Sequence, residues 1–235
     1  MNRAALPTRV RSVSEVTAHM REIELTGPEV PRLRLRAGAH LVVRVPDGEG
    51  HARRVYSIWR HSARDATLTI RVLSHAEGGP GCAWAGEVAV GDRITVEPPR
   101  RKITLDERAG FHLFIGDETA AVPLLAMRAA LPPAARVCGV FEAGGPGEEV
   151  PGVEGLPPLP WVHRGGGSAV GSRVLLRAVQ DLELPGGSGA AYVAGESETC
   201  RLIQRHLEQR GWSRRAVQSQ PQWAPGRPGF GAGGD

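Results

Sequence analysis

The first hundred residues consist of short runs of Val, Ile, Leu and Thr separated by turn residues. Runs of this length and composition predict strands, and clusters such as Gly27-Pro28 and Pro46-Asp47-Gly48 predict the turns between them. The six predicted strands are residues 8–16, 20–26, 40–45, 53–59, 67–73 and 93–97. Several short strands at this spacing indicate a closed antiparallel barrel.

The pattern changes after Lys102. Residues 111–115 form a buried type of strand, and residues 119–131 repeat Ala, Leu and Met at helical spacing. Further strands at 136–142, 161–163 and 190–194 alternate with helices at 172–179 and 198–210. This alternation predicts a parallel sheet covered by helices on both faces, a Rossmann-like α/β domain. We therefore expect a β-barrel domain over 1–105 and an α/β domain with a C-terminal tail over 106–235.

Composition narrows the range of partners and compartments. The chain has 235 residues, a net charge of +4 and a single lysine. No run approaches the ~20 apolar residues that cross a bilayer, and the N-terminus lacks the apolar core of a signal peptide. We expect a cytoplasmic protein without a membrane span. The three cysteines are widely separated, which argues against a disulfide framework or a metal site.

The mild excess of positive charge favours an anionic ligand, such as a dinucleotide or a carboxylate-rich chelate. Nucleic acid is the other common partner of a basic protein. The sequence has neither aromatic residues interleaved with a basic stripe nor a helix-turn-helix or zinc-finger pattern. We therefore expect a small-molecule partner and no nucleic acid.

The segment Arg54-Val55-Tyr56-Ser57 has the chemistry of a flat-cofactor site. In a strand, Arg54 and Tyr56 share one face and Ser57 points to the other. Tyr56 can stack on an aromatic ring, Ser57 can hydrogen-bond a ring nitrogen, and Arg54 can bind a phosphate. Arg53 is a weaker candidate for the phosphate. The alternative is an exposed strand without a ligand.

A glycine-rich stretch follows the predicted strand that ends at residue 73. It reads Gly78-Gly79-Pro80-Gly81 and opens a short predicted helix over residues 82–85. Four residues are expected to offer backbone N–H groups to a phosphate, because small residues let the backbone approach closely: Gly81, Cys82, Ala83 and Trp84. The Trp84 side chain is the exception, since packing is the simpler interpretation for it.

The second domain carries polar residues where strands are expected to end. Asp117, Glu118 and Thr119 follow a predicted strand and open a helix. Ligands of open α/β folds bind at this end of the sheet. The alternative is a helix cap, in which Asp117 or Thr119 accepts from free N–H groups and Glu118 interacts with the helix dipole.

Taken in order, these motifs resemble the flavin-binding half of the ferredoxin-reductase superfamily and, more narrowly, the siderophore-interacting protein family of FAD-dependent ferric-chelate reductases. The RxYS motif, the GP-x-x-x-WA segment and Gly91-Asp92 are matched in the first domain. In the second domain the matches are residues 116–123, 161–164 and 192–196. The resemblance covers roughly residues 9–227.

The resemblance implies FAD as cofactor and NADPH or NADH as electron donor. It implies that Tyr56 packs against the isoalloxazine ring, that Ser57 approaches its reactive nitrogen, and that Arg54 holds the pyrophosphate. It adds further candidates for cofactor contact: His75 before the glycine-rich turn, Asp117 and Thr119 at flavin and nicotinamide, Arg164 at the adenine-ribose phosphate, Glu196 at the nicotinamide, and Trp223 near the end. Of these, Ser57, Thr119 and Glu196 are the expected catalytic residues. His75 as a surface residue and Arg164 as a strand-end ion pair are the alternatives.

The C-terminal segment departs from the family pattern. Where the family usually has an aromatic pair followed by a basic residue, this chain has Gln222-Trp223-Ala224-Pro225-Gly226. Trp223 and Gly226 remain, whereas the Tyr and the basic residue are replaced. Lysines that bind ferric chelates in some members have no counterpart, since Lys102 lies elsewhere.

Three hypotheses of function follow. The first is an FAD-dependent oxidoreductase that passes a hydride from NAD(P)H to flavin and then reduces a ferric siderophore or similar acceptor. The second is a flavin-binding tailoring enzyme of a biosynthetic pathway, even a non-redox cyclase, whose small-molecule substrate is a pathway intermediate. The third is a siderophore-binding module without turnover.

Overall fold

The computed structural model describes residues 5–74 and 78–227. The described residues form two compact units, with 5–74 and 78–101 in the first and 102–227 in the second. The division lies four residues before the border expected from sequence. Within the described part of the chain, no helix is both long enough and apolar enough to span a bilayer.

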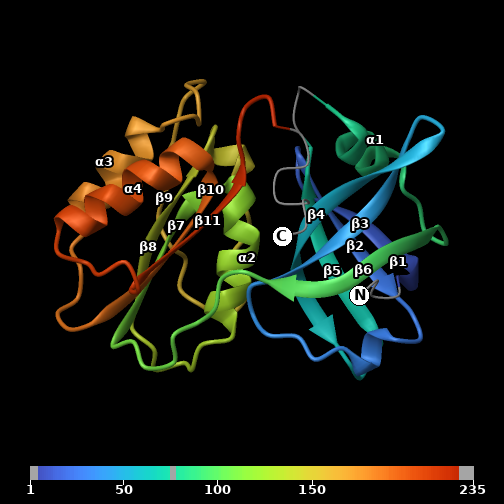
Figure 1. The fold of residues 1–235 in the computed structure, drawn as a ribbon, viewed down its shortest axis with the longest axis horizontal. Helices are drawn as coiled ribbons and strands as arrows, with labels where there is room; N and C mark the ends of the chain where they lie inside the picture. Colours follow the sequence, from blue (N-terminus) through green and yellow to red (C-terminus); the bar gives the residue numbers. More distant parts are fainter. Residues whose placement is uncertain (1–4, 75–77, 228–235) are drawn as a thin grey trace. The chain divides into compact units, whose positions relative to one another are not determined.

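The first unit is a closed antiparallel barrel, as predicted (Figure 1). Its strands follow the order β1-β2-β5-β4-β3-β6 around the barrel. They are β1 (Leu6–Thr17), β2 (Met20–Thr26), β3 (Ala39–Asp47), β4 (Gly50–Ser62), β5 (Thr67–Leu73) and β6 (Arg93–Arg101). A 3₁₀ turn, η1 (Val30–Arg32), precedes β3, and one helix, α1 (Pro80–Glu87), packs against β3, β4 and β5.

The alternation of side chains explains why these strands close into a barrel. Leu41, Val43 and Val45 of β3 are fully buried, and they belong to the hydrophobic cluster that fills the interior. Arg44, which lies between Val43 and Val45, points to the opposite face and is exposed. Closure pairs every strand on both edges, so the unit has no free sheet edge.

The second unit is the predicted α/β fold, with a five-stranded parallel sheet in the order β11-β10-β7-β8-β9. The strands are β7 (Phe111–Asp117), β8 (Val137–Ala143), β9 (Trp161–His163), β10 (Gly189–Glu196) and β11 (Val217–Trp223). The helices are α2 (Glu118–Ala129), α3 (Arg173–Asp181) and α4 (Ser197–Gln209), and η2 (Pro146–Glu148) is a 3₁₀ turn. In Figure 1, α2 covers one face of the sheet, and α3 and α4 cover the other.

The two faces of the sheet are packed differently. Leu113 and Ile115 of β7 lie in an aliphatic cluster with residues of α3 and α4. On the other face, the rings of His112, Phe114 and Tyr192 stack against one another, with 5.0 Å between the centroids of Phe114 and Tyr192. The Tyr192 hydroxyl accepts a hydrogen bond of 2.8 Å from the Asp106 N–H. That contact ties the entry segment of the unit to its central strands.

Strand β11 was not predicted from the sequence. Its residues, Val-Gln-Ser-Gln-Pro-Gln-Trp, lack the apolar run of a central strand and contain Pro221. An edge strand needs only one apolar and hydrogen-bonded side, and a proline is tolerated there. The parallel pairing of β11 with β10 supplies contacts that the composition of β11 does not predict.

Gly116 permits a close approach at the end of the central strand. A Cβ atom at this position would lie 2.7 Å from the Ala194 carbonyl oxygen of β10 and would also meet the Ala120 side chain of α2. Real Cβ atoms do not approach backbone so closely, so any side chain here would push the helix and the strand apart.

We expect Gly116→Ala to lower the free energy of unfolding of the second unit by about 1–3 kcal/mol, because it overpacks a rigid contact. Gly152→Ala is the matched control, since a Cβ atom there meets nothing within 4 Å. The control should change stability by no more than about 0.5 kcal/mol. Urea unfolding of both variants measures the difference, and equal stabilities would contradict the packing argument.

Candidate functional site

Arg54 and Tyr56 lie on the same face of β4, under the start of α1. Tyr56 is opposite Leu41 in the strand register, and Arg54 is opposite Val43. A Cβ atom on Gly81 would lie 2.7 Å from the Tyr56 hydroxyl oxygen and 3.3 Å from Cγ of Arg54. Only glycine lets the helix start approach both side chains this closely.

The start of α1 corrects one expectation from the sequence. The helix begins at Pro80, not at Cys82, and the Ala83 N–H already donates to the Gly79 carbonyl oxygen at 3.0 Å. The amides of Ala83 and Trp84 are therefore inside the helix and cannot bind a phosphate. The backbone donors left at this end are those of Gly81 and Cys82, since proline has no N–H. Among the described residues, which leave out 75–77 just before this helix, no side chain caps the helix start.

Arg53 and Arg54 are neighbours with different partners. Arg53 donates two hydrogen bonds to the Glu97 carboxylate, at 2.8 and 2.9 Å. The hydrogen bond to Arg53 holds the pKa of Glu97 below its ordinary value. For Arg54, the polar contact recorded among the described residues is one bond of 3.0 Å to the Arg53 carbonyl oxygen. No carboxylate of the described residues forms an ion pair with it, so Arg54 is the cation available to a ligand.

The Tyr56 ring stacks on Trp84, with 5.7 Å between centroids. Trp84 is buried in the barrel core, so the packing interpretation of its side chain is correct. Burial raises the pKa of Tyr56 well above its ordinary value, which keeps its hydroxyl protonated. Ser57 faces the other way and is paired in register with His40, a buried histidine that the sequence analysis missed. His75 lies outside the described residues.

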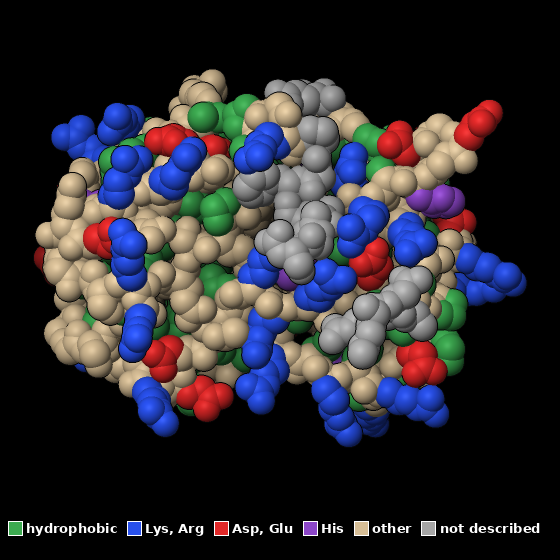
Figure 2. Space-filling view, in the orientation of Figure 1, with side chains coloured by type: hydrophobic (Ala, Val, Ile, Leu, Met, Phe, Trp, Pro, Cys, Tyr) green, Lys and Arg blue, Asp and Glu red, His purple; other side chains and the backbone are tan. Residues whose placement is uncertain are grey.

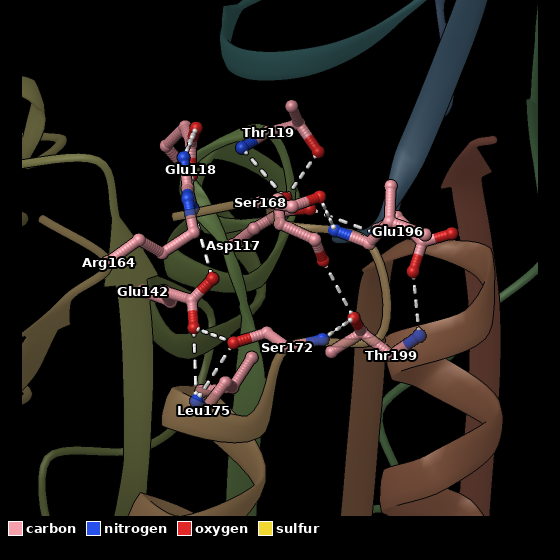
Figure 3. A network of polar contacts seen from close by, with 12 residues as sticks. Asp117, Glu118, Thr119, Glu142, Arg164, Ser168, Ser172, Leu175, Glu196 and Thr199 are labelled. Atoms are coloured by element: carbon pink, nitrogen blue, oxygen red, sulfur yellow. Dashed lines mark hydrogen bonds and ion pairs between the residues drawn. The ribbon is translucent and has the colours of Figure 1, made fainter. Parts of the chain in front are cut away.

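Asp117 is the hub of a hydrogen-bond network at the carboxyl ends of the strands in the second unit (Figure 3). Its Oδ1 accepts from the N–H groups of Thr119 and Ala120 and from the Thr119 hydroxyl, at 3.0, 3.1 and 2.5 Å. Its Oδ2 accepts from the Glu196 N–H and from the Trp223 indole, both at 2.9 Å. One carboxylate thus joins β7, α2, β10 and β11.

The environment of Asp117 changes its acidity. Complete burial and the nearby Glu118 raise the pKa of Asp117 to about 6, and the hydrogen bonds from Thr119, Trp223 and Ala120 act in the opposite direction. Asp117 therefore caps the start of α2, as in the alternative interpretation of this residue. The Thr119 hydroxyl is committed to the same carboxylate. Contact of Asp117, Thr119 and Trp223 with a cofactor stays a prediction.

Glu196 caps the start of α4. Its carboxylate accepts from the backbone N–H groups of Glu198, Thr199 and Gly171, at 2.8, 2.7 and 3.1 Å. Burial acts to raise the pKa of Glu196, but these hydrogen bonds outweigh it and hold the pKa below its ordinary value. The structure therefore gives Glu196 a structural role, and its contact with a nicotinamide stays a prediction.

Arg164 is held between two carboxylates, as in the ion-pair interpretation of this residue. It contacts Glu118 at 2.7 Å and Glu142 at 3.1 Å, and its side chain is 10% exposed. Burial acts to lower the pKa of Arg164, but the hydrogen bonds to both carboxylates raise it on balance. Glu142 also accepts from the Ser172 hydroxyl and from the Leu175 N–H at the start of α3.

Roles for Glu142 and Ser172 were not predicted from the sequence. A signal for each was present. Glu142 is near the end of β8, opposite Asp117 in the parallel register, and carboxyl ends of parallel strands meet at one edge. Ser172 stands directly before the helix, where serine is a preferred cap.

The patterns of two protein families match this chain. The siderophore-interacting FAD-binding domain matches residues 36–103, and the siderophore-interacting protein domain matches residues 109–226. This chain belongs to the siderophore-interacting protein family. The family match confirms the resemblance inferred from the sequence, and it makes the barrel an FAD-binding domain.

Similar proteins of known name or structure support the assignment to this family. The ferric vibriobactin reductase of Vibrio cholerae is 29% identical over 181 residues, which are 74% of this chain but only 65% of that protein. A siderophore utilization protein from T. fusca superposes with a TM-score of 0.82 at 26% identity, covering 96% of this chain and 95% of the other. Phthalate dioxygenase reductase shares the fold, with a TM-score of 0.73 at 21% identity over 93% of this chain and 68% of the other.

We expect Glu196→Gln to lower the free energy of unfolding by about 1–3 kcal/mol at pH 7, because it removes the charge that three backbone donors stabilise. A carboxylate with a depressed pKa stabilises the fold above its unfolded pKa and loses that effect as the pH falls through its folded pKa. The difference between wild type and variant should therefore shrink below about pH 4.5.

Thermal or urea unfolding at several pH values measures this difference. Glu198→Gln, two residues away on the exposed surface of α4, is the control and should change stability by less than about 0.5 kcal/mol at every pH. A gap between wild type and Glu196→Gln that stays constant from neutral to acidic pH would contradict the proposed role of the charge.

Proposed function

We propose that this protein is an FAD-dependent oxidoreductase that takes electrons from NADH or NADPH and delivers them to a ferric siderophore or a similar chelate. The observation that carries the proposal lies on the FAD-binding barrel: among the described residues, no side chain caps the start of α1, and no carboxylate pairs with the neighbouring Arg54. The relationship to a ferric vibriobactin reductase supports the choice of acceptor.

The residues of the barrel fit the phosphate end of FAD. Gly81 and Cys82 supply backbone donors at the start of α1, and the Arg54 side chain passes directly beneath that start. Backbone donors and a guanidinium together form a typical site for a pyrophosphate. When bound, FAD supplies the two-electron and one-electron chemistry that joins a hydride donor to a ferric acceptor.

The same strand can position the ring end of the cofactor. Trp84 covers one side of Tyr56 and holds the ring of that residue in a fixed orientation for stacking. Ser57, on the opposite face of β4, can donate a hydrogen bond to a ring nitrogen. The role of the chain is thus to bind and orient, which requires a rigid β4 anchored in a closed barrel.

Positive charge alone does not select the acceptor. Lys and Arg side chains are spread over the face seen in Figure 2, with Asp and Glu side chains among them. Several arginines of the chain form ion pairs, such as Arg100, which lies 3.7 Å from Glu97. Recognition of an anionic chelate therefore depends on local groups rather than on the net charge of +4.

We expect Arg54→Gln to weaken FAD binding about tenfold to a hundredfold, because a charge-assisted hydrogen bond contributes ~1.5–3 kcal/mol. Arg53→Gln is the matched control, since its guanidinium is bound to Glu97, and it should change FAD affinity by less than about threefold. Fluorescence titration of the apoprotein with FAD measures both. Equal effects of the two substitutions would contradict the assignment of Arg54.

Anaerobic visible spectroscopy tests the reaction itself. We expect NADPH or NADH to bleach the flavin absorbance of the purified holoprotein, and a ferric siderophore to restore it. A flavin that stays yellow with both nucleotides, but is bleached by dithionite, would overturn the reductase proposal. The altered segment around Trp223 would then favour a flavin enzyme with a different substrate.

A further inference from the structure

The topology of the second unit marks where a dinucleotide would bind. The sheet order is β11-β10-β7-β8-β9, so the chain places β8 and β9 on one side of β7 and then β10 and β11 on the other. The order in which strands are added therefore reverses at β7. In open parallel sheets, ligands bind outside the carboxyl ends of the two strands at such a switch point. Here those ends are Asp117 of β7 and Glu196 of β10.

This switch point is occupied by the protein's own side chain. The Asp117 carboxylate bridges the two strands through the Glu196 N–H. A Cβ atom on Gly195 would lie 2.6 Å from a carboxylate oxygen of Asp117, so the carboxylate packs directly against the Gly195 backbone. The two N–H groups at the start of α2 that Asp117 accepts from are also unavailable.

The other two helix starts at this edge are occupied in the same way. Glu142 accepts from the Leu175 N–H at the start of α3, and Glu196 accepts from two N–H groups at the start of α4. Figure 3 shows these carboxylates pointing into the turns that they cap. To use these N–H groups, a pyrophosphate would have to displace a buried carboxylate from them.

The charge at this edge of the sheet is also unfavourable for binding a phosphate. Arg164 is surrounded by Glu118 and Glu142, and its guanidinium is therefore neutralised. The Glu148 carboxylate lies against Gly144, in the loop after β8. Among the described residues, the cations at the helix starts are Arg173, which is exposed, and Arg201, whose side chain is 62% exposed and pairs with Glu198. Solvent screens such groups, so they contribute little.

The barrel provides the contrast within the same chain. Among the described residues, the start of α1 has no side-chain cap and lies on Arg54, which no carboxylate of these residues neutralises. Within this described part, a carboxylate holds N–H groups at each of the three helix starts of the second unit, and none does so at the helix start of the first.

We propose that this protein recognises its dihydronicotinamide donor by the nicotinamide end alone and makes no specific contact with the phosphates of the donor. The inference rests on the proposed function and defines its donor class. NADPH, NADH and reduced nicotinamide mononucleotide, which keeps one phosphate but lacks the adenosine monophosphate half, are then nearly equivalent substrates. At the carboxyl edge of this sheet, no described residue offers the 2′-phosphate that distinguishes NADPH from NADH a buried cation without a carboxylate partner.

The experiment uses the FAD-loaded protein, so that the phosphate site of the barrel is already filled. Anaerobic stopped-flow measurement of flavin bleaching gives a second-order rate constant for each of the three donors. We expect the three constants to lie within about tenfold of one another. A constant for NADPH or NADH that exceeds the constant for the mononucleotide by more than about tenfold would overturn the inference.

Binding provides a readout that does not depend on turnover. Titration calorimetry of the holoprotein with ADP-ribose and with its 2′-phosphate should show no saturable binding up to about 1 mM, and saturation below that concentration would overturn the inference. Arg173→Gln and Arg201→Gln should each change the NADPH rate constant by less than about twofold. A larger loss with NADPH, but not with the mononucleotide, would show a phosphate contact and overturn it as well.

The two proposals fail in different ways. If none of the three donors bleaches a flavin that dithionite does bleach, the proposed electron donor is wrong and this inference falls with it. If NADPH bleaches the flavin far faster than the mononucleotide does, the reductase proposal stands and only the inference about the phosphates is wrong.

Discussion

The second unit depends on a single buried carboxylate. Asp117, at the end of the central strand, accepts five hydrogen bonds from three other elements of the fold, α2, β10 and β11. An isolated charge in that position would be strongly unfavourable, and only the full set of donors makes it tolerable. The neighbouring glycines follow from this constraint, because Gly116 and Gly195 leave the space in which strand, helix and carboxylate meet. The edge of the sheet is therefore rigid and internally satisfied.

The barrel is stabilised in a different way, by a hydrophobic core. Its interior is a mainly aliphatic core that also includes Trp84, and many of its polar groups lie on the strands and at the start of α1. Arg53 is neutralised by Glu97, whereas Arg54, one residue later and on the other face of the strand, is not. The period of two in a strand is what lets adjacent arginines have different roles. In the proposed anion site, the described residues leave one cation without a carboxylate partner and one helix start without a side-chain cap.

Both units illustrate how a helix start can serve either stability or binding. A carboxylate from the end of a strand satisfies the free N–H groups and stabilises the fold, but it removes the donors that a phosphate would use. Among the described residues, the helix start of the FAD-binding unit has no side-chain cap, whereas side chains cap the helix starts of the α/β unit. Family membership makes the barrel an FAD-binding domain, and these local hydrogen bonds are the basis of the inference about the phosphates of the electron donor.

The sequence by itself determined the architecture and the location of the flavin motif. Hydrophobic periodicity predicted the six barrel strands and four of the five parallel strands, and the order of motifs identified the family. These properties are local, since each depends on residues close together in the chain. Only the tertiary structure showed that β11 completes the sheet, that Ala83 lies inside α1, and which carboxylate caps which helix. Those outcomes depend on strand register and on contacts between distant residues, such as Asp117 with Trp223 and Arg164 with Glu118, which no local pattern encodes.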